Sequence, residues 1–273
     1  MNIIEAVRAR KSVRCYTGVP LGEAHLEKIA AFIRGLSPAF GGLARLEMVR
    51  GRPETEKLGT YGSLRGARDF IMLIHDGAPL SRLSAGHMLE EAVLFCTGLG
   101  LGTVWMALFG KNFAKKTLLG PEEKLTHIAA VGYPDPEASP RLLPRLASTL
   151  IKPRTRKAFG EIFFLEAWGR PLPLEAAGEY RQPLEMLRLA PSALNRQPWR
   201  VIRRDKDLHF YRTGNSSADM DLGIALCHFA LTCRELGIEG QFETLLSGDM
   251  PAAPGAGYVI SWRLNLHERE PGQ

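Results

Sequence analysis

The feature that most constrains the fold of this chain is an apolar helical segment that occurs twice, 137 residues apart. Both copies end at a Leu-Gly pair and continue into a stretch typical of a β-strand. The shift places four residues of one copy on identical residues of the other: Leu94, Cys96, Leu99 and Gly100 on Leu231, Cys233, Leu236 and Gly237. The surrounding order of helix, loop, strand, long helix and strand is also shared. Since this period is far longer than a solenoid unit, we expect two related halves about a pseudo-twofold axis.

The hydrophobic pattern predicts several helices and strands in each half. Helices are expected at residues 2–9, 26–33 and 85–99, and from an N-cap at Asp219 to Leu236. Strands are expected at 46–49, 70–74, 127–132, 200–203, 208–211 and 257–263, and a Pro-rich linker at 133–156. We therefore predict an α+β fold, a mixed sheet flanked by helices, with one half at residues 1–160 and the other at 161–273.

Composition limits the class of protein. The chain has 273 residues and 45% hydrophobic content, which is ample for a packed core. No apolar run is long enough to span a bilayer, so we expect no membrane partner. The N-terminus lacks a signal-peptide pattern. Four cysteines show neither a CxxC pair nor metal-ligand spacing, so we expect a cytoplasmic protein without a metal site.

The net charge of +6 arises from 35 basic and 29 acidic residues, and the basic ones cluster near residues 8–14 and 152–157. Either cluster alone is typical of a solvated surface. A nucleic-acid partner is an alternative, but the clusters lack interleaved aromatic residues and no nucleic-acid-binding motif accompanies them. We therefore expect no nucleic-acid partner.

The first basic cluster contains Arg10-Lys11-Ser12-Val13-Arg14, directly after the first helix. It supplies three cations and a hydroxyl group within five residues, which suits a phosphate dianion. Alternate positions allow Arg10 and Ser12 to face a phosphate while Arg14 faces another edge of the ligand. The alternative interpretation is a basic helix end that complements the helix dipole.

A second segment, residues 190–199, reads Ala-Pro-Ser-Ala-Leu-Asn-Arg-Gln-Pro-Trp. Its two prolines predict a fixed loop, and Pro198 predicts extended backbone at Gln197. Ser192, Asn195 and Gln197 would then offer donors and acceptors to the edge of a ligand ring, while Trp199 enters the core. The alternative is a helix-to-strand connection with polar caps.

These two segments together resemble the flavin mononucleotide (FMN) site of the nitroreductase superfamily. There, an Arg-Arg-Ser-x-Arg segment and a Pro-Ser-x-x-Asn-x-Gln-Pro-Trp segment meet at a dimer interface. The chain is similar to the TM-nitroreductase branch, whose members mimic the dimer within one chain. Residues 36–42 stand where the first half would carry its own polar loop, but they lack the Asn and Gln. The resemblance therefore implies one complete site per chain and a monomer that needs no partner chain.

The resemblance also implies which residues hold FMN. The stretch after the long helix would run beside the isoalloxazine ring, and the second basic cluster would reach the phosphate, with Arg156 and Lys157 preferred to Arg154. The predicted cofactor-binding residues are Arg10, Lys11, Ser12, Arg14, Thr103, Val104, Trp105, Met106, Arg154, Arg156, Lys157, Pro191, Ser192, Ala193, Asn195 and Gln197.

The implied activity is hydride transfer from NAD(P)H through FMN to an electron-poor small-molecule acceptor, such as a nitroaromatic or a quinone. The cofactor supplies the chemistry, so we assign no catalytic side chain. The alternative is an FMN-binding protein without turnover, serving as a flavin sensor or carrier.

Overall fold

The computed structural model describes residues 1–50, 64–138, 155–246 and 248–264. Its helices are α1 (Ile3–Ala9), α2 (Glu23–Gly35), α3 (Pro79–Gly98), α5 (Phe159–Ile162), α6 (Arg181–Arg188) and α7 (Ala218–Glu235), with 3-10 turns at Lys111–Lys116, Glu175–Tyr180 and Ala193–Asn195. Its strands are β1 (Ala44–Arg50), β2 (Asp69–His75), β3 (Gly102–Met106), β4 (Lys124–Gly132), β5 (Phe163–Leu165), β6 (Trp199–Arg204), β7 (Asp207–Thr213), β8 (Gly240–Glu243) and β9 (Ala256–Leu264).

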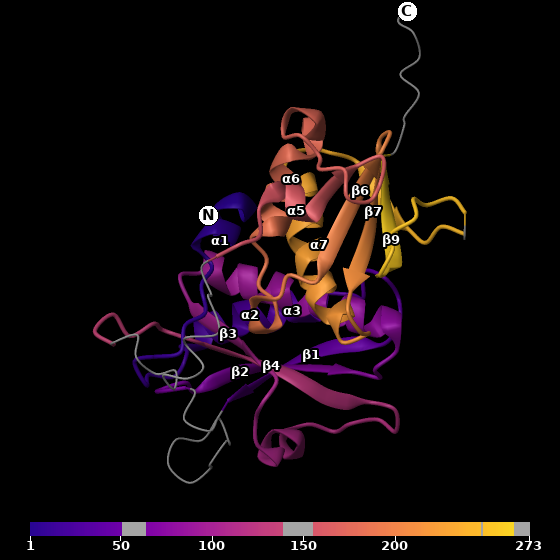
Figure 1. Cartoon of the computed structure of the whole chain (residues 1–273). Helices are drawn as coiled ribbons and strands as arrows, with labels where there is room; N and C mark the ends of the chain where they lie inside the picture. Colours follow the sequence, from indigo (N-terminus) through magenta and orange to yellow (C-terminus); the bar gives the residue numbers. More distant parts are fainter. Residues whose placement is uncertain (51–63, 139–154, 247, 265–273) are drawn as a thin grey trace, which may run out of the picture.

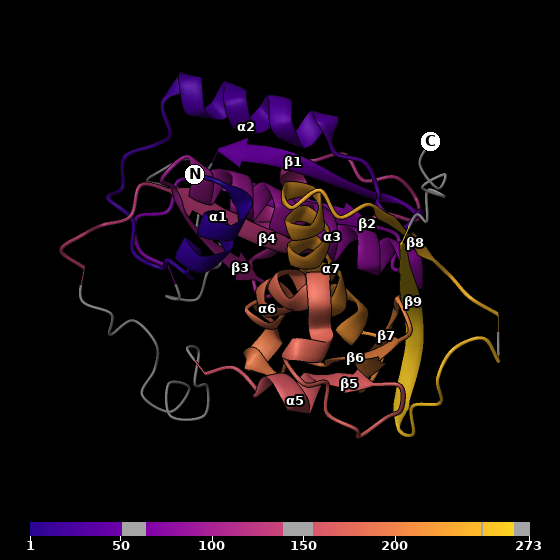
Figure 2. The ribbon, with the colours of Figure 1, turned by 90° about the horizontal axis from the view of Figure 1, so that it is seen from above.

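Two sheets enclose a helical layer, and each half of the chain supplies one sheet (Figure 1). The first sheet has the order β1-β2-β4-β3 and is antiparallel. The second has the order β5-β6-β7-β9-β8 and is mixed, because β5 runs parallel to β6. Helices α3 and α7 pack against each other at the centre (Figure 2). The predicted α+β pseudo-dimer is confirmed, with two sheets in place of one.

Strand β2 is buried along its whole length, as its apolar run predicts. Ile71 and Leu73 belong to the core cluster formed with α2 and α3. Phe70 and Met72 point to the other face, where Phe113 of the turn Lys111–Lys116 covers them. Both faces of the strand are therefore buried. A strand of this kind has a continuous apolar sequence, because neither face has to meet water.

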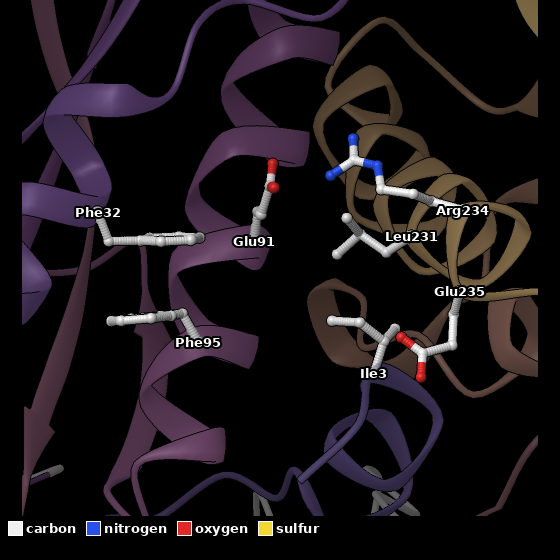
Figure 3. Close-up of a pocket in the computed structure, with 7 residues that line it drawn as sticks. All are labelled: Ile3, Phe32, Glu91, Phe95, Leu231, Arg234 and Glu235. Carbon is white, nitrogen blue, oxygen red and sulfur yellow. The ribbon is translucent and has the colours of Figure 1, made fainter.

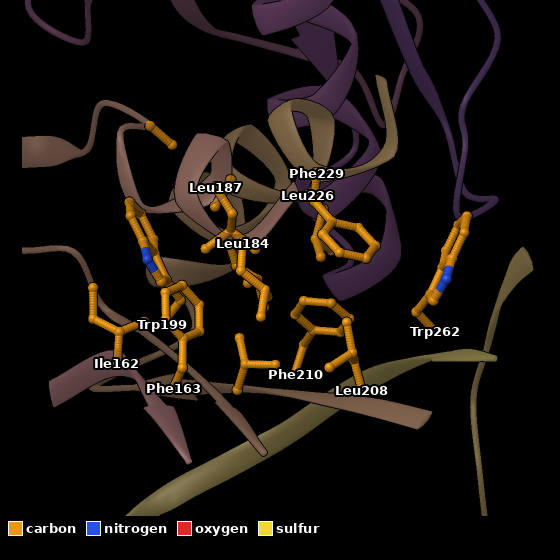
Figure 4. Close-up of a cluster of buried hydrophobic side chains, with 14 of the residues drawn as sticks. Ile162, Phe163, Leu184, Leu187, Trp199, Leu208, Phe210, Leu226, Phe229 and Trp262 are labelled. Carbon is orange, nitrogen blue, oxygen red and sulfur yellow. The ribbon is translucent and has the colours of Figure 1, made fainter. Parts of the chain in front are cut away.

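The core of the second half gathers large aromatic side chains between its sheet and the helices α6 and α7 (Figure 4). Trp199, Phe210 and Phe229 are fully buried there. The prediction that Trp199 belongs to the core is thus confirmed. Phe210 and Phe229 meet edge-on with ring centroids 5.5 Å apart, an arrangement that adds to the free energy of burial.

Several predicted boundaries were wrong. Asp219 is not the N-cap of α7, because that position is Ser217 and the Asp219 carboxylate instead pairs with Arg82 (3.2 Å) and Arg212 (2.8 Å). Helix α3 begins at Pro79. Proline is favoured in the first helical turn because an N–H there has no acceptor within the helix, so no hydrogen bond is lost. The short elements α5, α6 and β5 were not predicted, whereas β8 is the strand predicted to follow the Leu236-Gly237 pair. Most of the predicted linker, residues 139–154, lies outside the described residues.

In the described part of the chain, we find no helix with the length and hydrophobicity needed to cross a bilayer.

Candidate functional site

Residues from both halves line one cavity of about 300 Å³, a volume in the range of small-molecule sites. The first half contributes Arg10, Ser12, Arg14, Trp105, Met106, Ala107, His127 and Arg156. The second half contributes Pro191, Ser192, Ala193, Leu194, Asn195, Met220, Asp221 and Ile224. The fold thus brings together the two segments that the sequence analysis singled out, although they lie about 180 residues apart.

The segment after α1 runs in extended form beside β3. Ser12 forms a parallel bridge with Thr103, and the Val13 amide donates to the Thr103 carbonyl (2.8 Å). Gly102 permits this approach, because a Cβ at that position would lie 2.9 Å from the Val13 side chain. The alternation of an extended chain then directs three side chains into the cavity, Arg10, Ser12 and Arg14.

Five predicted residues do not line the cavity: Lys11, Thr103, Val104, Lys157 and Gln197. Lys11 is exposed on the opposite side of the extended segment. Thr103 and Val104 are buried in β3, directly before Trp105 and Met106, which do line the cavity. Lys157 is half-buried and gives its backbone amide, not its ammonium group, to the Gln197 side chain (2.9 Å). Arg154 lies outside the described residues.

Arg156 is the third arginine of the cavity. Its guanidinium donates to the Leu189 carbonyl (3.0 Å) and to Asn195 Oδ1 (3.1 Å). Burial lowers the pKa of Arg156, and the charges of Arg10 and Arg188 lower it further. Three guanidinium groups, those of Arg10, Arg14 and Arg156, therefore face one partly desolvated space, an arrangement that favours an anionic ligand.

The polar loop has an unusual backbone. Leu194, Asn195 and Gln197 all adopt left-handed φ values, +52°, +55° and +50°. The prediction of extended backbone at Gln197 was therefore wrong. Left-handed backbone costs roughly 1–2 kcal/mol for a residue other than glycine, so the surrounding contacts must hold this loop in place. Such strain is common at binding sites.

The loop side chains supply these contacts. Ser192 Oγ accepts from the Gln197 amide (2.9 Å), and Asn195 Nδ2 donates to the Thr155 carbonyl (2.9 Å). Gln197 is buried and bonds to Asn195 and to the Lys157 amide. The sequence predicted that the two prolines fix the loop and leave its polar groups for a ligand; these groups instead fix much of the loop themselves.

The cavity includes side chains that the sequence analysis did not select. His127 projects from β4 and meets Trp105 edge-on, with centroids 6.0 Å apart. Burial lowers its pKa to about 4, so its imidazole is neutral near pH 7. Asp221, in the first turns of α7, accepts from the Ala193 amide (3.0 Å), and burial raises its pKa to about 6. A polar residue within an apolar strand or helix was the available signal for both.

The remaining unselected lining residues are Ala107, Leu194, Met220 and Ile224. Met220 and Ile224 lie on α7, whose apolar sequence indicated core alone. They add apolar surface to the lining of the cavity.

The corresponding place in the other half has a different lining. Ser84 Oγ accepts from the Phe40 amide (3.0 Å), as Asp221 accepts from the Ala193 amide. At the 137-residue spacing, Phe242 stands in place of Trp105, and the Phe40 ring packs on it with centroids 5.1 Å apart. The open cavity of about 540 Å³ beside these rings has Arg234 as the lone arginine among its lining residues.

With this geometry, the fold and the cavity define a protein of the nitroreductase class. A solved structure of a "putative nitroreductase" from Thermotoga maritima is similar to the chain, with 25% identity, a TM-score of 0.63, and coverage of 97% of this chain and 94% of that one. The profile of the family described as "Putative TM nitroreductase" matches residues 2–233. The chain therefore belongs to this TM-nitroreductase family.

Smaller nitroreductases are similar to about half of the chain. A nitroreductase family protein from Clostridium difficile 630 has 20% identity and a TM-score of 0.41, covering 57% of this chain and 99% of that one. An FMN-dependent nitroreductase from Clostridium difficile R20291 has 19% identity and a TM-score of 0.40, covering 56% and 98%. A search of curated proteins gives no match.

Proposed function

We propose that this chain is an FMN-dependent oxidoreductase of nitroreductase type, which passes hydride from NAD(P)H to an electron-poor acceptor such as a nitroaromatic or a quinone. Membership of the TM-nitroreductase family supports the class of reaction. The observation that carries the proposal is the meeting of three arginines with the strained polar loop at one cavity between the halves. FMN, when bound, would supply the redox chemistry.

The residues present fit this cofactor. Arg10 Nε is buried without a hydrogen-bond acceptor, as expected of a group prepared for an anion. Arg10, Arg14 and Arg156 would bind the phosphate together with Ser12. Trp105, Met106 and Ile224 provide apolar surface for a flat ring, and the neutral imidazole of His127 adds a polar group without a charge. No side chain is assigned a catalytic role.

Removal of two cations tests the site. We expect Arg10→Ala with Arg14→Ala to weaken FMN binding at least about a hundredfold, because each charged hydrogen bond contributes roughly 1.5–3 kcal/mol. The matched control is Arg8→Ala, which removes an exposed cation of the same cluster that does not line the cavity. Flavin content is read from the absorption spectrum of the purified protein. A double variant that retains wild-type FMN affinity would contradict the proposal.

Turnover separates the enzyme from a flavin sensor or carrier. Steady-state oxidation of NADH and NADPH, each with nitrofurazone or menadione, should be fast for an enzyme and absent for a carrier that still binds FMN. A cytoplasmic location, the absence of nucleic-acid and membrane partners, the monomeric state and the boundary at residue 160 stay predictions.

A further inference from the structure

Behind the cavity, one buried carboxylate contacts two of the residues that line it. Glu90 of α3 is fully buried. Its Oε2 accepts from the indole N–H of Trp105 (2.7 Å), and its Oε1 lies 3.8 Å from Arg10 Nε. Oε1 also lies 2.8 Å from Nε2 of His228, a fully buried residue of α7. Glu90 thus joins the arginine and the aromatic wall of the cavity to the central helix pair.

The hydrogen bonds around His228 define where one proton lies. His228 Nδ1 is 3.0 Å from the Met186 carbonyl, which can only accept, so Nδ1 carries a hydrogen. The short contact between Nε2 and Glu90 then needs a second proton, on either the ring or the carboxyl group. Because the Trp105 indole and the Arg10 guanidinium can only donate, they favour the carboxylate form of Glu90 and a charged His228 ring.

This arrangement restricts Arg10. Its side chain is 9% exposed, and its buried Nε has the Glu90 carboxylate nearby at a distance longer than a hydrogen bond. The contact is therefore an ion pair that attracts the guanidinium without taking up its N–H groups. Among the described residues the Arg10 guanidinium has no hydrogen-bond acceptor, so its donors remain for a ligand in the cavity.

The arrangement of Glu90 with Arg10 and Trp105 occurs in the first half of the chain and has no counterpart at the equivalent positions of the second half. At the 137-residue spacing, Cys227 stands in place of Glu90 and Phe242 in place of Trp105. Neither replacement carries a charge. The two halves share their fold at this level, so the fold does not require a buried carboxylate here. The carboxylate occurs in the half that supplies Arg10, Arg14 and Arg156 to the cavity.

We propose that Glu90 is a positioning residue of the FMN site, which holds the Arg10 guanidinium and the Trp105 ring where they meet the cofactor. This inference rests on the proposed function. Glu90 does not line the cavity, and it acts through the two residues that do.

Glu90→Gln tests the role with little change in shape. The Gln side chain can still accept from the Trp105 indole and can donate to a neutral His228 Nε2, so the hydrogen bonds of the core survive. The variant loses the carboxylate charge and, with it, the ring charge of His228, so the net charge near the cavity is unchanged. What it loses is the attraction on Arg10. We expect about tenfold weaker FMN binding, the size of coupling common between contacting groups.

The matched control is Glu91→Gln on the same helix. Glu91 faces a different cavity, between Phe95, Leu231 and Arg234 (Figure 3). We expect wild-type FMN affinity in this variant. A double-mutant cycle with Arg10→Ala shows whether Glu90 acts through Arg10: most of the Glu90→Gln effect should disappear in the Arg10→Ala background.

Each outcome has a separate meaning. If wild-type protein binds no FMN, the proposed function is wrong. If wild-type protein binds FMN and folded Glu90→Gln binds it equally well, or if its loss is fully additive with that of Arg10→Ala, the positioning role is wrong. If the variant fails to fold, nitrogen NMR of His228 in wild-type protein decides. Two protonated ring nitrogens at neutral pH support the role, and a neutral ring overturns it, because Glu90 would then be uncharged.

Discussion

Gly86 of α3 and Gly223 of α7 make the same contact from opposite sides of one helix crossing. A Cβ on Gly86 would lie 2.2 Å from the Met220 carbonyl oxygen, and a Cβ on Gly223 would lie 2.1 Å from the Leu83 carbonyl oxygen. Both glycines and both carbonyls are related by the 137-residue spacing. The two central helices therefore cross at their pseudo-twofold axis with backbone against backbone.

This contact predicts a large effect of a single methyl group. We expect Gly86→Ala and Gly223→Ala each to lower the free energy of unfolding by about 3 kcal/mol, because a backbone carbonyl cannot turn aside as a side chain can. Gly98→Ala is the control, since nothing lies within 4 Å of a Cβ there, and it should be neutral or stabilise by up to about 1 kcal/mol. Urea unfolding measures all three. Equal stability of the Gly86 and Gly98 variants would exclude a close crossing.

Much of the fold could be predicted from the sequence, because the elements around the duplicated helix have strong periodicity. The apolar run of β2 and the hairpin of β6 and β7, with its turn at Asp205 and Lys206, are where the pattern indicated. The strand β5 is too short for a period to show, with three residues. It pairs in parallel with β6, more than thirty residues further along the chain, and local sequence does not encode that pairing.

The residues of the candidate site were likewise predicted only in part. Arg10, Ser12 and the polar loop stood out because their residue types cluster within short segments. Asp221 and His127 did not, because each belongs to a mainly apolar element outside the two polar segments and becomes part of the cavity through tertiary packing. The sequence also did not indicate which side chains hold the loop in shape. The left-handed backbone at Gln197 is accompanied by hydrogen bonds to the Lys157 amide, 40 positions away, and to Ser192 of the same loop.

We predict one FMN per chain and a monomer. The counterpart cavity is lined by a single arginine, and the chain between β5 and α6 holds Arg170 as its lone cation, so a second phosphate would lack the donors that offset its desolvation. Released flavin is quantified against protein, with light scattering for the mass. Two flavins per chain would show that the second half also binds. Half a flavin per chain in an obligate dimer would show that the site is completed between chains.

Asn195 is predicted to support both the loop and Arg156. In Asn195→Gly the left-handed backbone remains free of steric strain, but the side-chain hydrogen bonds to Thr155 and Arg156 are lost. We therefore expect weaker FMN binding and a free energy of unfolding lower by about 1–2 kcal/mol. Asn195→Ala loses the same bonds and also strains the backbone, so it should be less stable than Asn195→Gly by about a further 1 kcal/mol. Thermal unfolding and FMN titration measure both variants. Identical stability of Ala and Gly would mean that the loop relaxes out of its left-handed form.

The last prediction concerns Asp221, whose pKa burial raises from 3.8 to about 6, against the opposing effects of the Ala193 amide and the charge of Arg196. Arg10, Arg14, Arg156 and the neutral His127 also line the cavity that Asp221 faces. A raised pKa means that the folded state binds the proton more tightly than the unfolded state. The contribution of Asp221 to stability therefore falls as pH rises from about 4 to about 6, and its full cost persists above that range.

Asp221→Asn removes this cost and retains an oxygen that accepts from the Ala193 amide. Relative to wild type, we expect no gain in the free energy of unfolding near pH 4 and a gain of up to about 3 kcal/mol at pH 8. Urea unfolding at the two pH values isolates Asp221, because the titration of all other groups is common to both proteins. A gain that is the same at pH 4 and pH 8 would show that Asp221 titrates normally and is not desolvated by the cavity.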